Sequence, residues 1–194
     1  AWLKTEGVDI KAIGFFALIQ FPYTWKFLWS PLMDRFPILG LGRRRGWMLA
    51  SQLALLVSIA ALGWLAPARD LGTIAVLAVG VALFSASQDI VLDAFRREIL
   101  SDRELGLGNS VHVNAYRIAG LVPGSLSLIL ADHVAWSTVF MVTALFMLPG
   151  VVLTLLVREP QRAVVPKSLR EAVVEPFHEF ITRQGWQSAL LILG

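Results

Sequence analysis

Residues 74–97 read IAVLAVGVALFSASQDIVLDAFRR, and this stretch decides the fold. It begins as an aliphatic run long enough to cross a bilayer, and it then places Asp89 and Asp93 one helical turn apart. Acidic residues inside a spanning helix are rare, and they usually face a bundle interior or a water-filled path that carries protons or substrates. Because a spacing of four puts both carboxylates on one helix face, we predict that they face the same space. The stretch indicates a protein that moves something across a membrane.

The composition agrees with a membrane protein. Hydrophobic residues make up 56% of the 194 residues and charged residues 16%, whereas soluble domains carry about 25% charged residues. We therefore predict an all-α membrane fold, a polytopic bundle of transmembrane helices. The chain has no cysteine, its three histidines have no metal-ligand spacing, and no glycine-rich phosphate loop is present. We expect no metal site, no cofactor and no enzymatic activity.

Hydropathy predicts five spans and the start of a sixth. The five cover about residues 12–30, 47–66, 73–95, 109–131 and 138–157, residues 158–187 form a linker, and residues 188–194 begin the next span. A run of about 19 residues rises roughly 28 Å, which just crosses the hydrocarbon core. Pro22 and Pro123 are expected to bend their helices. Residues 1–157 are thus predicted to form an N-terminal transmembrane bundle. We also expect the chain to be a piece of a longer protein, whose remaining transmembrane helices and the lipid bilayer would surround it.

The basic residues predict the orientation. Three alternate loops, at 31–46, 96–108 and 158–184, together hold twelve: Arg35, Arg43, Arg44, Arg45, Arg96, Arg97, Arg103, Arg158, Arg162, Lys167, Arg170 and Arg183. The opposite side holds only Lys4, Lys11 and Arg69. By the positive-inside rule the twelve are cytoplasmic. The net charge of +3 therefore reflects topology, and we expect no nucleic acid partner.

The linker carries its own helix signal. Ser168 and Glu171 have the spacing of a capping box, and apolar residues recur every four positions from Leu169 to Ile181. This pattern predicts an amphipathic helix on the cytoplasmic membrane face. The alternative is a plain solvated linker with a few apolar anchors.

Four charged residues are predicted to share one layer in the inner part of the membrane. Asp89 lies roughly 9 Å from the cytoplasmic end of its span, and Asp93, Arg117 and Lys26 lie at similar depths by the helical rise. We infer that Asp89 pairs with Arg117, with Asp93 and Lys26 as a second pair or part of one network, because a lone ion at depth is costly. Desolvation favours the protonated carboxyl and a nearby arginine the ionised one, so a conformational change could move a proton.

Each of these charges also has a simpler interpretation. Asp93 could pair with Arg97 four residues on, within its own helix. Lys26 could extend its ammonium group to the interface. Asp89 and Arg117 could form a salt bridge that is purely structural.

Residues 30–49, SPLMDRFPILGLGRRRGWML, resemble the cytoplasmic loop signature of the major facilitator superfamily. That signature joins an Asp-Arg pair to a Gly-Arg-Arg cluster, here separated by the insertion 36–41. With this insertion the segment resembles a narrower group, the bacterial muropeptide permeases. The other shared pieces are DIKAIGFF (9–16), KFLWSPLMDR (26–35), GRRRGW (42–47), SASQDIVLDA (85–94), the YR at 116–117 and the PK at 166–167.

The resemblance implies a transporter of twelve helices in two halves, of which this chain would supply helices two to six and the start of seven. Such a protein imports anhydro-muropeptides (GlcNAc-anhydroMurNAc with or without peptide) by proton symport across the bacterial inner membrane. This import serves peptidoglycan recycling and β-lactamase induction. The loop residues Asp34, Arg35, Arg43, Arg44 and Arg45 would then lock neighbouring helices in one access state. They could also be topology signals only.

A polyhydroxylated substrate needs hydrogen-bonding partners in a cavity. The candidates near the charged layer are Gln88, His112, Asn114 and Tyr116. Two alternatives stay open. The chain could belong to a related facilitator for another polar organic solute, such as an acetyl-CoA-type carrier, or to a membrane subunit that transports nothing.

Overall fold

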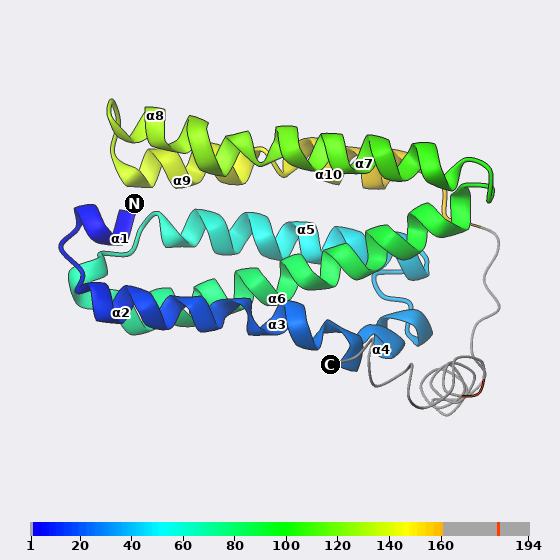
Figure 1. Ribbon diagram of the computed structural model, residues 1–194, viewed down its shortest axis with the longest axis horizontal. Helices are drawn as coiled ribbons and strands as arrows, with labels where there is room; N and C mark the ends of the chain where they lie inside the picture. Colours follow the sequence, from blue (N-terminus) through cyan, green and yellow to red (C-terminus); the bar gives the residue numbers. More distant parts are fainter. Residues whose placement is uncertain (1, 161–181, 183–194) are drawn as a thin grey trace.

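The structure is a computed structural model that describes residues 2–160 and residue 182. All the regular elements in this described part are helices (Figure 1). They are α1 (Trp2–Thr5), α2 (Ile10–Phe15), η1 (Phe16–Gln20), α3 (Phe21–Trp25), η2 (Lys26–Leu28), α4 (Ser30–Arg35), α5 (Arg43–Leu62), α6 (Pro67–Ile99), α7 (Leu105–Ala119), η3 (Val122–Leu126), α8 (Ser127–Ala131), α9 (Trp136–Leu145) and α10 (Leu148–Leu156). The predicted linker helix and the start of the next span lie outside the described residues, apart from Thr182 and residues 158–160.

Four helical runs in the described part are long and apolar enough to cross a membrane. They are α5, α6, the run 105–131 formed by α7, η3 and α8, and the run 136–156 formed by α9 and α10. These helices extend a few residues beyond several of the predicted spans, because a helix does not end where the hydrocarbon ends. The chain is an all-α, multi-pass membrane protein, as the composition predicts.

The segment predicted as the first span, with a bend at Pro22, is divided into short pieces. Between residues 10 and 35 the chain alternates α-helix with two 3-10 turns, η1 and η2. Pro22 occupies the first turn of α3, and Pro31 the first turn of α4. Proline has no N–H to donate, so each proline is compatible with a helix start and interrupts the helix before it. The helix is therefore interrupted next to Pro22, where the sequence predicted a bend, and a second interruption follows at η2.

Pro123 has a comparable effect in the fourth span. The residues from Val122 to Leu126 form a π-helix between α7 and α8. The hydroxyl of Ser127 donates to the carbonyl of Val122 at 2.9 Å, which helps to satisfy the backbone of this irregular turn. Ser127 is buried and lies 3.0 Å from the hydroxyl of Thr143 on α9. Ser127 thus lies in close contact with α9, whereas Gly120 and Gly124 on the same span are exposed.

Helix α5 is the centre of the bundle and packs against α6, α9 and α10. Six of its nine buried residues recur every three or four positions, at Arg44, Met48, Ser51, Leu55, Ser58 and Leu62. Many of these buried side chains are small or polar, whereas large apolar residues point outward. Val76 is 72% exposed and Leu156 76% exposed. This inverted distribution is typical of helices that pack through small residues and face lipid with aliphatic ones.

Figure 1 shows α7 to α10 along one side of the bundle and α2, α3 and α6 along the other, with α5 between them. At one end lie α4, the start of α5 and the ends of α6 and α10. We call this the inner end, because its loops are the ones predicted to be cytoplasmic. A small hydrophobic core of Met33, Met48 and Val91 lies at this end, and Trp29 and Trp47 pack against it. At the opposite, outer end Trp2 packs on Trp136 and Phe140, with ring centroids 6.5 and 4.7 Å apart. Tryptophans near both ends agree with the aromatic belts of membrane proteins.

Candidate functional site

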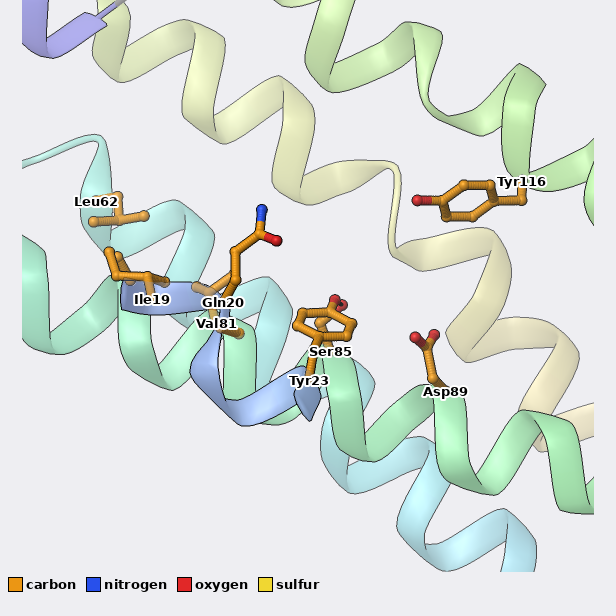
Figure 2. Close-up of a pocket in the computed structure, with 10 residues that line it drawn as sticks. Ile19, Gln20, Tyr23, Leu62, Val81, Ser85, Asp89 and Tyr116 are labelled. Atoms are coloured by element: carbon orange, nitrogen blue, oxygen red, sulfur yellow. Dashed lines mark hydrogen bonds between the residues drawn. The ribbon is translucent and has the colours of Figure 1, made fainter. Parts of the chain in front are cut away.

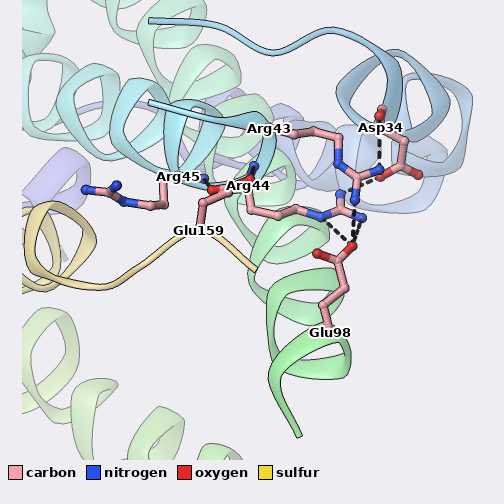
Figure 3. A network of polar contacts seen from close by, with 6 residues as sticks. All are labelled: Asp34, Arg43, Arg44, Arg45, Glu98 and Glu159. Atoms are coloured by element: carbon pink, nitrogen blue, oxygen red, sulfur yellow. Dashed lines mark hydrogen bonds and ion pairs between the residues drawn. The ribbon is translucent and has the colours of Figure 1, made fainter. Parts of the chain in front are cut away.

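Two groups of polar side chains stand out, and the first is at the inner end (Figure 3). We call it the inner-end network; it consists of Asp34, Arg43, Arg44, Arg45, Glu98 and Glu159. Arg44 is at its centre, with a side chain only 6% exposed. Its guanidinium donates to Oε1 of Glu98 through Nη2 at 2.6 Å and Nε at 3.0 Å. It also forms an ion pair with Asp34. One arginine thus ties the end of α4 to the end of α6.

Arg43 strengthens the same junction. Its Nη2 donates to Oε1 of Glu98 at 2.8 Å, and its Nη1 donates to the backbone carbonyl of Asp34 at 3.2 Å. Arginine suits this position because its planar group offers several donors in fixed directions. Buried ions are tolerated only when they are paired and hydrogen-bonded in this way.

Glu159 joins the chain after α10 to the start of α5. Its carboxylate accepts from the backbone N–H groups of Arg44 at 2.7 Å and Arg45 at 3.0 Å. These are among the first N–H groups of α5, which have no partner within their own helix, and a carboxylate also suits the helix dipole there. In return the Arg45 guanidinium donates to the carbonyls of Thr154 at 2.9 Å and Leu155 at 2.7 Å, at the end of α10. The two helix ends therefore cap each other.

The network contains three basic and three acidic side chains, so its formal charge is zero. Four of its members are sequence-predicted loop residues: Asp34, Arg43, Arg44 and Arg45. The fifth predicted residue, Arg35, lies over the ring of Phe36 at 5.6 Å and forms no ion pair within the described residues. Sequence reasoning missed Glu98 and Glu159. The only sign in the sequence is that both are acids at the ends of spans that enter strongly basic loops, and this does not indicate their partners.

The second group lines two cavities beside α6 (Figure 2). The larger cavity, of about 650 Å³, is lined by Ile19, Gln20, Tyr23, Leu62, Ala78, Val81, Ala82, Ser85, Asp89 and Tyr116. The smaller, of about 360 Å³, is lined by Tyr23, Asp89, Leu92, Asp93, His112, Val113 and Tyr116. Tyr23, Asp89 and Tyr116 line both, so the two cavities adjoin at these residues. They come from α3, α6 and α7 respectively.

Asp89 is half-buried and has no hydrogen-bond or ion-pair partner within residues 2–160. The predicted pair with Arg117 is not formed, and Arg117 is exposed on α7. The groups that act electrostatically on Asp89 are Lys26, Asp93 and His112. The shared layer stays a prediction, and the pairing inferred within it, Asp89 with Arg117, is not present among the described residues. Hydropathy gives depth along a helix and says nothing of the rotation that decides which side chains meet.

Asp93 forms a different contact from the one expected. Its carboxylate accepts from Nη2 of Arg96 at 3.0 Å, three residues on, rather than from Lys26 or Arg97. The Asp93 side chain is 54% exposed. This intrahelical pair is of the simple kind considered from the sequence, with a neighbouring arginine as partner.

The four sequence-predicted substrate contacts are not brought together as a set. Tyr116 and His112 line the cavities from α7. Asn114 donates to the carbonyl of Ser110 at 2.8 Å along its own helix. Gln88 lines neither cavity, but its Oε1 is buried without a hydrogen-bond partner in the described part of the chain. A buried acceptor without a partner is costly.

Three residues of the larger cavity were missed by sequence reasoning: Gln20, Tyr23 and Ser85. The hydroxyl of Tyr23 is 2.5 Å from Oγ of Ser85, to which it donates. Nearby, the indole N–H of Trp29 donates to Oγ of Ser87 at 3.0 Å. These two bonds fasten the interrupted first segment to α6. The only sign in the sequence was the presence of Tyr23 and Trp29 in the first segment and of Ser85 and Ser87 in α6. This pattern cannot be distinguished from ordinary helix packing.

Comparisons with known proteins place this geometry in context. The family model described as the Major Facilitator Superfamily matches residues 10–194. The chain is 46% identical over 196 residues to the anhydromuropeptide permease of Escherichia coli strain K12, an alignment covering 100% of this chain and 40% of the relative. It is 51% identical over 187 residues to an uncharacterized protein of Haemophilus influenzae, covering 95% and 44%. It is 29% identical over 148 residues to putative transporter AmpG 1 of Rickettsia bellii, covering 74% and 36%. The chain spans less than half the length of these relatives.

Proposed function

This chain belongs to the Major Facilitator Superfamily, and we propose that it is the N-terminal part of a permease for anhydro-muropeptides. The permease would sit in the bacterial inner membrane and import GlcNAc-anhydroMurNAc, with or without peptide, from the periplasm to the cytoplasm. The imported compounds would enter peptidoglycan recycling and induce β-lactamase. The observation that carries this proposal is the 46% identity, over the whole chain, to a protein named anhydromuropeptide permease. The resemblance seen in the sequence covers the same residues.

We further propose that Asp89 carries the coupled proton. It is a carboxylate on a spanning helix, it lines both cavities, and no group in the described part is hydrogen-bonded to it. Such a group is free to change its protonation as the surrounding helices open or close. Asp93 is the weaker candidate, because it is paired with Arg96 and more than half exposed.

The inner-end network fits the role of a lock. It connects α4, α5, α6 and the end of α10 by side chains that make several bonds each. Opening the permease towards the cytoplasm requires helices at this end to separate. The lock would favour the state in which they are together, and binding energy from the substrate would have to overcome it.

The test is uptake of labelled GlcNAc-anhydroMurNAc by the complete permease in vesicles of defined orientation, with and without an inward proton gradient. We expect the unmodified protein to accumulate the sugar only with the gradient. Asp89→Asn should lose gradient-driven accumulation yet still exchange labelled for unlabelled sugar. Asp93→Asn should retain both.

Two outcomes would overturn parts of the proposal. If the unmodified permease does not accumulate this sugar under any gradient, the substrate assignment is wrong and a different polar solute is carried. If accumulation by Asp89→Asn keeps its dependence on the gradient, the proton is carried elsewhere. Exchange separates loss of coupling from loss of binding, because exchange needs substrate binding but no net proton movement.

A further inference from the structure

The charge of the cavity lining limits which part of a muropeptide it can accept. Within the described residues, the only charged groups lining the larger cavity or the smaller one are Asp89 and Asp93, and His112 is the only other titratable group besides the tyrosines. No lysine or arginine lines either. Lys26 acts on Asp89 but is not among the lining residues. An acidic ligand would therefore be repelled here, whereas an uncharged polar ligand would not.

A muropeptide has two chemically different parts. Its peptide bears carboxylates, and in the form without peptide the lactyl group bears one instead, whereas its two sugar rings are uncharged. A pyranose ring presents C–H groups on its faces and hydroxyl or amide groups around its rim. The matching surface is an aromatic ring beside a few hydrogen-bonding groups, within an otherwise apolar wall. The larger cavity has this composition.

Tyr23 provides the aromatic ring. It lines both cavities, and Figure 2 shows its ring next to Ser85, with Asp89 further along α6. Its hydroxyl bonds to Ser85 at 2.5 Å, which fixes the orientation of the ring. Gln20, one turn earlier, adds an amide to the same wall. Tyr116 faces them from α7, with its hydroxyl directed into the cavity (Figure 2). The remaining wall is aliphatic, with Val81 and Leu62 among its members.

We propose that the larger cavity binds the uncharged sugar rings of the substrate, with the lactyl group directed away from Asp89, and that the ring of Tyr23 is the platform on which a sugar ring stacks. Ser85 acts through Tyr23, as a positioning residue that holds the ring in place. The acidic peptide lies outside these two cavities. The inference rests on the proposed function for the identity of the sugar, and its test is designed to be separable from it.

The test compares Tyr23→Leu, which removes the ring, with Tyr23→Phe, which keeps the ring and removes the hydroxyl. The matched control is Phe21→Leu. Phe21 is on the same helix and is 59% exposed, but it stacks on Trp25 and lines neither cavity. All variants are made in the complete permease and compared for uptake of GlcNAc-anhydroMurNAc with and without its tripeptide.

We expect Tyr23→Leu to raise KM for both substrates by roughly tenfold, with kcat within about twofold, because a stacked ring contributes about that much to binding. Tyr23→Phe should raise KM by less than about threefold, since it loses only one modest hydrogen bond. Ser85→Ala should resemble Tyr23→Phe. Phe21→Leu should leave KM unchanged. A Tyr23→Leu protein with unchanged KM, or with KM raised only for the peptide-bearing substrate, would overturn the inference.

A binding measurement keeps this test independent of transport. Calorimetric titration of the purified complete protein with N,N′-diacetylchitobiose, an uncharged disaccharide, measures directly whether the protein has a sugar-binding site. We expect binding that is lost in Tyr23→Leu and kept in Phe21→Leu. If the unmodified protein binds chitobiose through Tyr23 but does not import muropeptides, the proposed function fails and the sugar site stands. If it imports muropeptides but chitobiose binding does not depend on Tyr23, the sugar site fails and the function stands.

Discussion

The polar side chains of the inner-end network and those of the larger cavity differ in their hydrogen bonding and exposure. In the network every arginine donates at least two hydrogen bonds, and the Arg44 side chain is 6% exposed. Around the cavity, Asp89 has no hydrogen-bonded partner in the described residues and Tyr116 is 74% exposed. Both regions border α6, one at its inner end and one midway along it.

The difference separates groups that hold the helices together from groups left open for a ligand. Charges that satisfy one another stabilise one arrangement of helices, and removing one leaves others uncompensated. Polar groups without partners contribute little to the stability of that arrangement, and a ligand can bond to them. Substitutions in the network should therefore change stability, and substitutions in the cavity should change transport. The predictions below test this separation.

The largest effect is expected from Arg44→Ala. This substitution leaves Glu98, 16% exposed, and Asp34, 33% exposed, without their shared partner. Breaking a buried ion pair from one side costs about 3 kcal/mol of unfolding free energy. Denaturant unfolding of the complete permease in detergent measures the change. Arg35→Ala is the control, because Arg35 lies over the Phe36 ring and forms no ion pair within the described residues, and it should cost less than about 1 kcal/mol. Equal effects of the two substitutions would show that the network is not what holds this end together.

Glu159→Ala should have a smaller effect of the same sign. It removes the acceptor for the N–H groups of Arg44 and Arg45 at the start of α5. Loss of an N-terminal cap costs about 1 kcal/mol. Glu159→Gln keeps an acceptor oxygen and should cost less. Glu6→Ala, at an exposed acid near the outer end, should leave the unfolding free energy unchanged in the same assay. If Glu159→Gln costs as much as Glu159→Ala, the charge rather than the acceptor is what matters.

How far the sequence predicts these two regions depends on the kind of information each needs. Four members of the network are in the sequence signature of residues 30–49. Their proximity to the other inner loops is expected, because all inner loops lie at one end of the bundle. Glu98 and Glu159 contact them from residues 54 and 115 positions away from Arg44. No local pattern joins residues so distant in the chain. The network could be predicted in part, and its closing acids could not.

The cavity was less predictable, because it depends on helix rotation and on a break in a helix. Depth placed Asp89 and Arg117 in one layer, but Arg117 turned out to lie on an exposed part of α7. The sequence predicted a first span at residues 12–30 with one bend at Pro22, whereas two 3-10 turns interrupt this segment. Tyr23 lines the cavity from α3, between those turns. Hydropathy averages over such breaks, so the aromatic lining from this segment could not be read from the sequence.

Asp89→Asn should change stability little, and in the opposite direction from Arg44→Ala. An amide replaces a half-buried carboxylate that has no partner within residues 2–160, so the desolvation cost of a charge is removed. We expect an unchanged or slightly increased unfolding free energy, by less than about 1 kcal/mol. Asp93→Asn is the comparison. It loses the 3.0 Å pair with Arg96, which is worth about 0.3 kcal/mol for an exposed pair on one helix. A large loss of stability in Asp89→Asn would place Asp89 with the structural charges and remove the distinction between the two regions.

The smallest effect is expected from a group that belongs to neither region, at the entry to α7. The Glu104 carboxylate accepts from the hydroxyl of Ser101 at 2.7 Å and from its backbone N–H at 3.0 Å. These hydrogen bonds, the hydroxyl first, hold the pKa of Glu104 below its ordinary value. The bonds therefore stabilise this turn fully above the ordinary glutamate pKa, and that stabilisation is lost as the pH falls through the lowered one. Hydrogen exchange of the segment 101–108 should accelerate, relative to its intrinsic rate, as the pH falls through this range. In Ser101→Ala the hydroxyl bond is absent at every pH, so the acceleration in this segment should be reduced. Hydrogen exchange of the network and cavity segments should be the same in this variant as in the unmodified protein. If Ser101→Ala instead changed hydrogen exchange across the whole inner end, the turn would be coupled to the inner-end network. The division into a local turn, a stabilising network and a ligand-binding cavity would then be wrong.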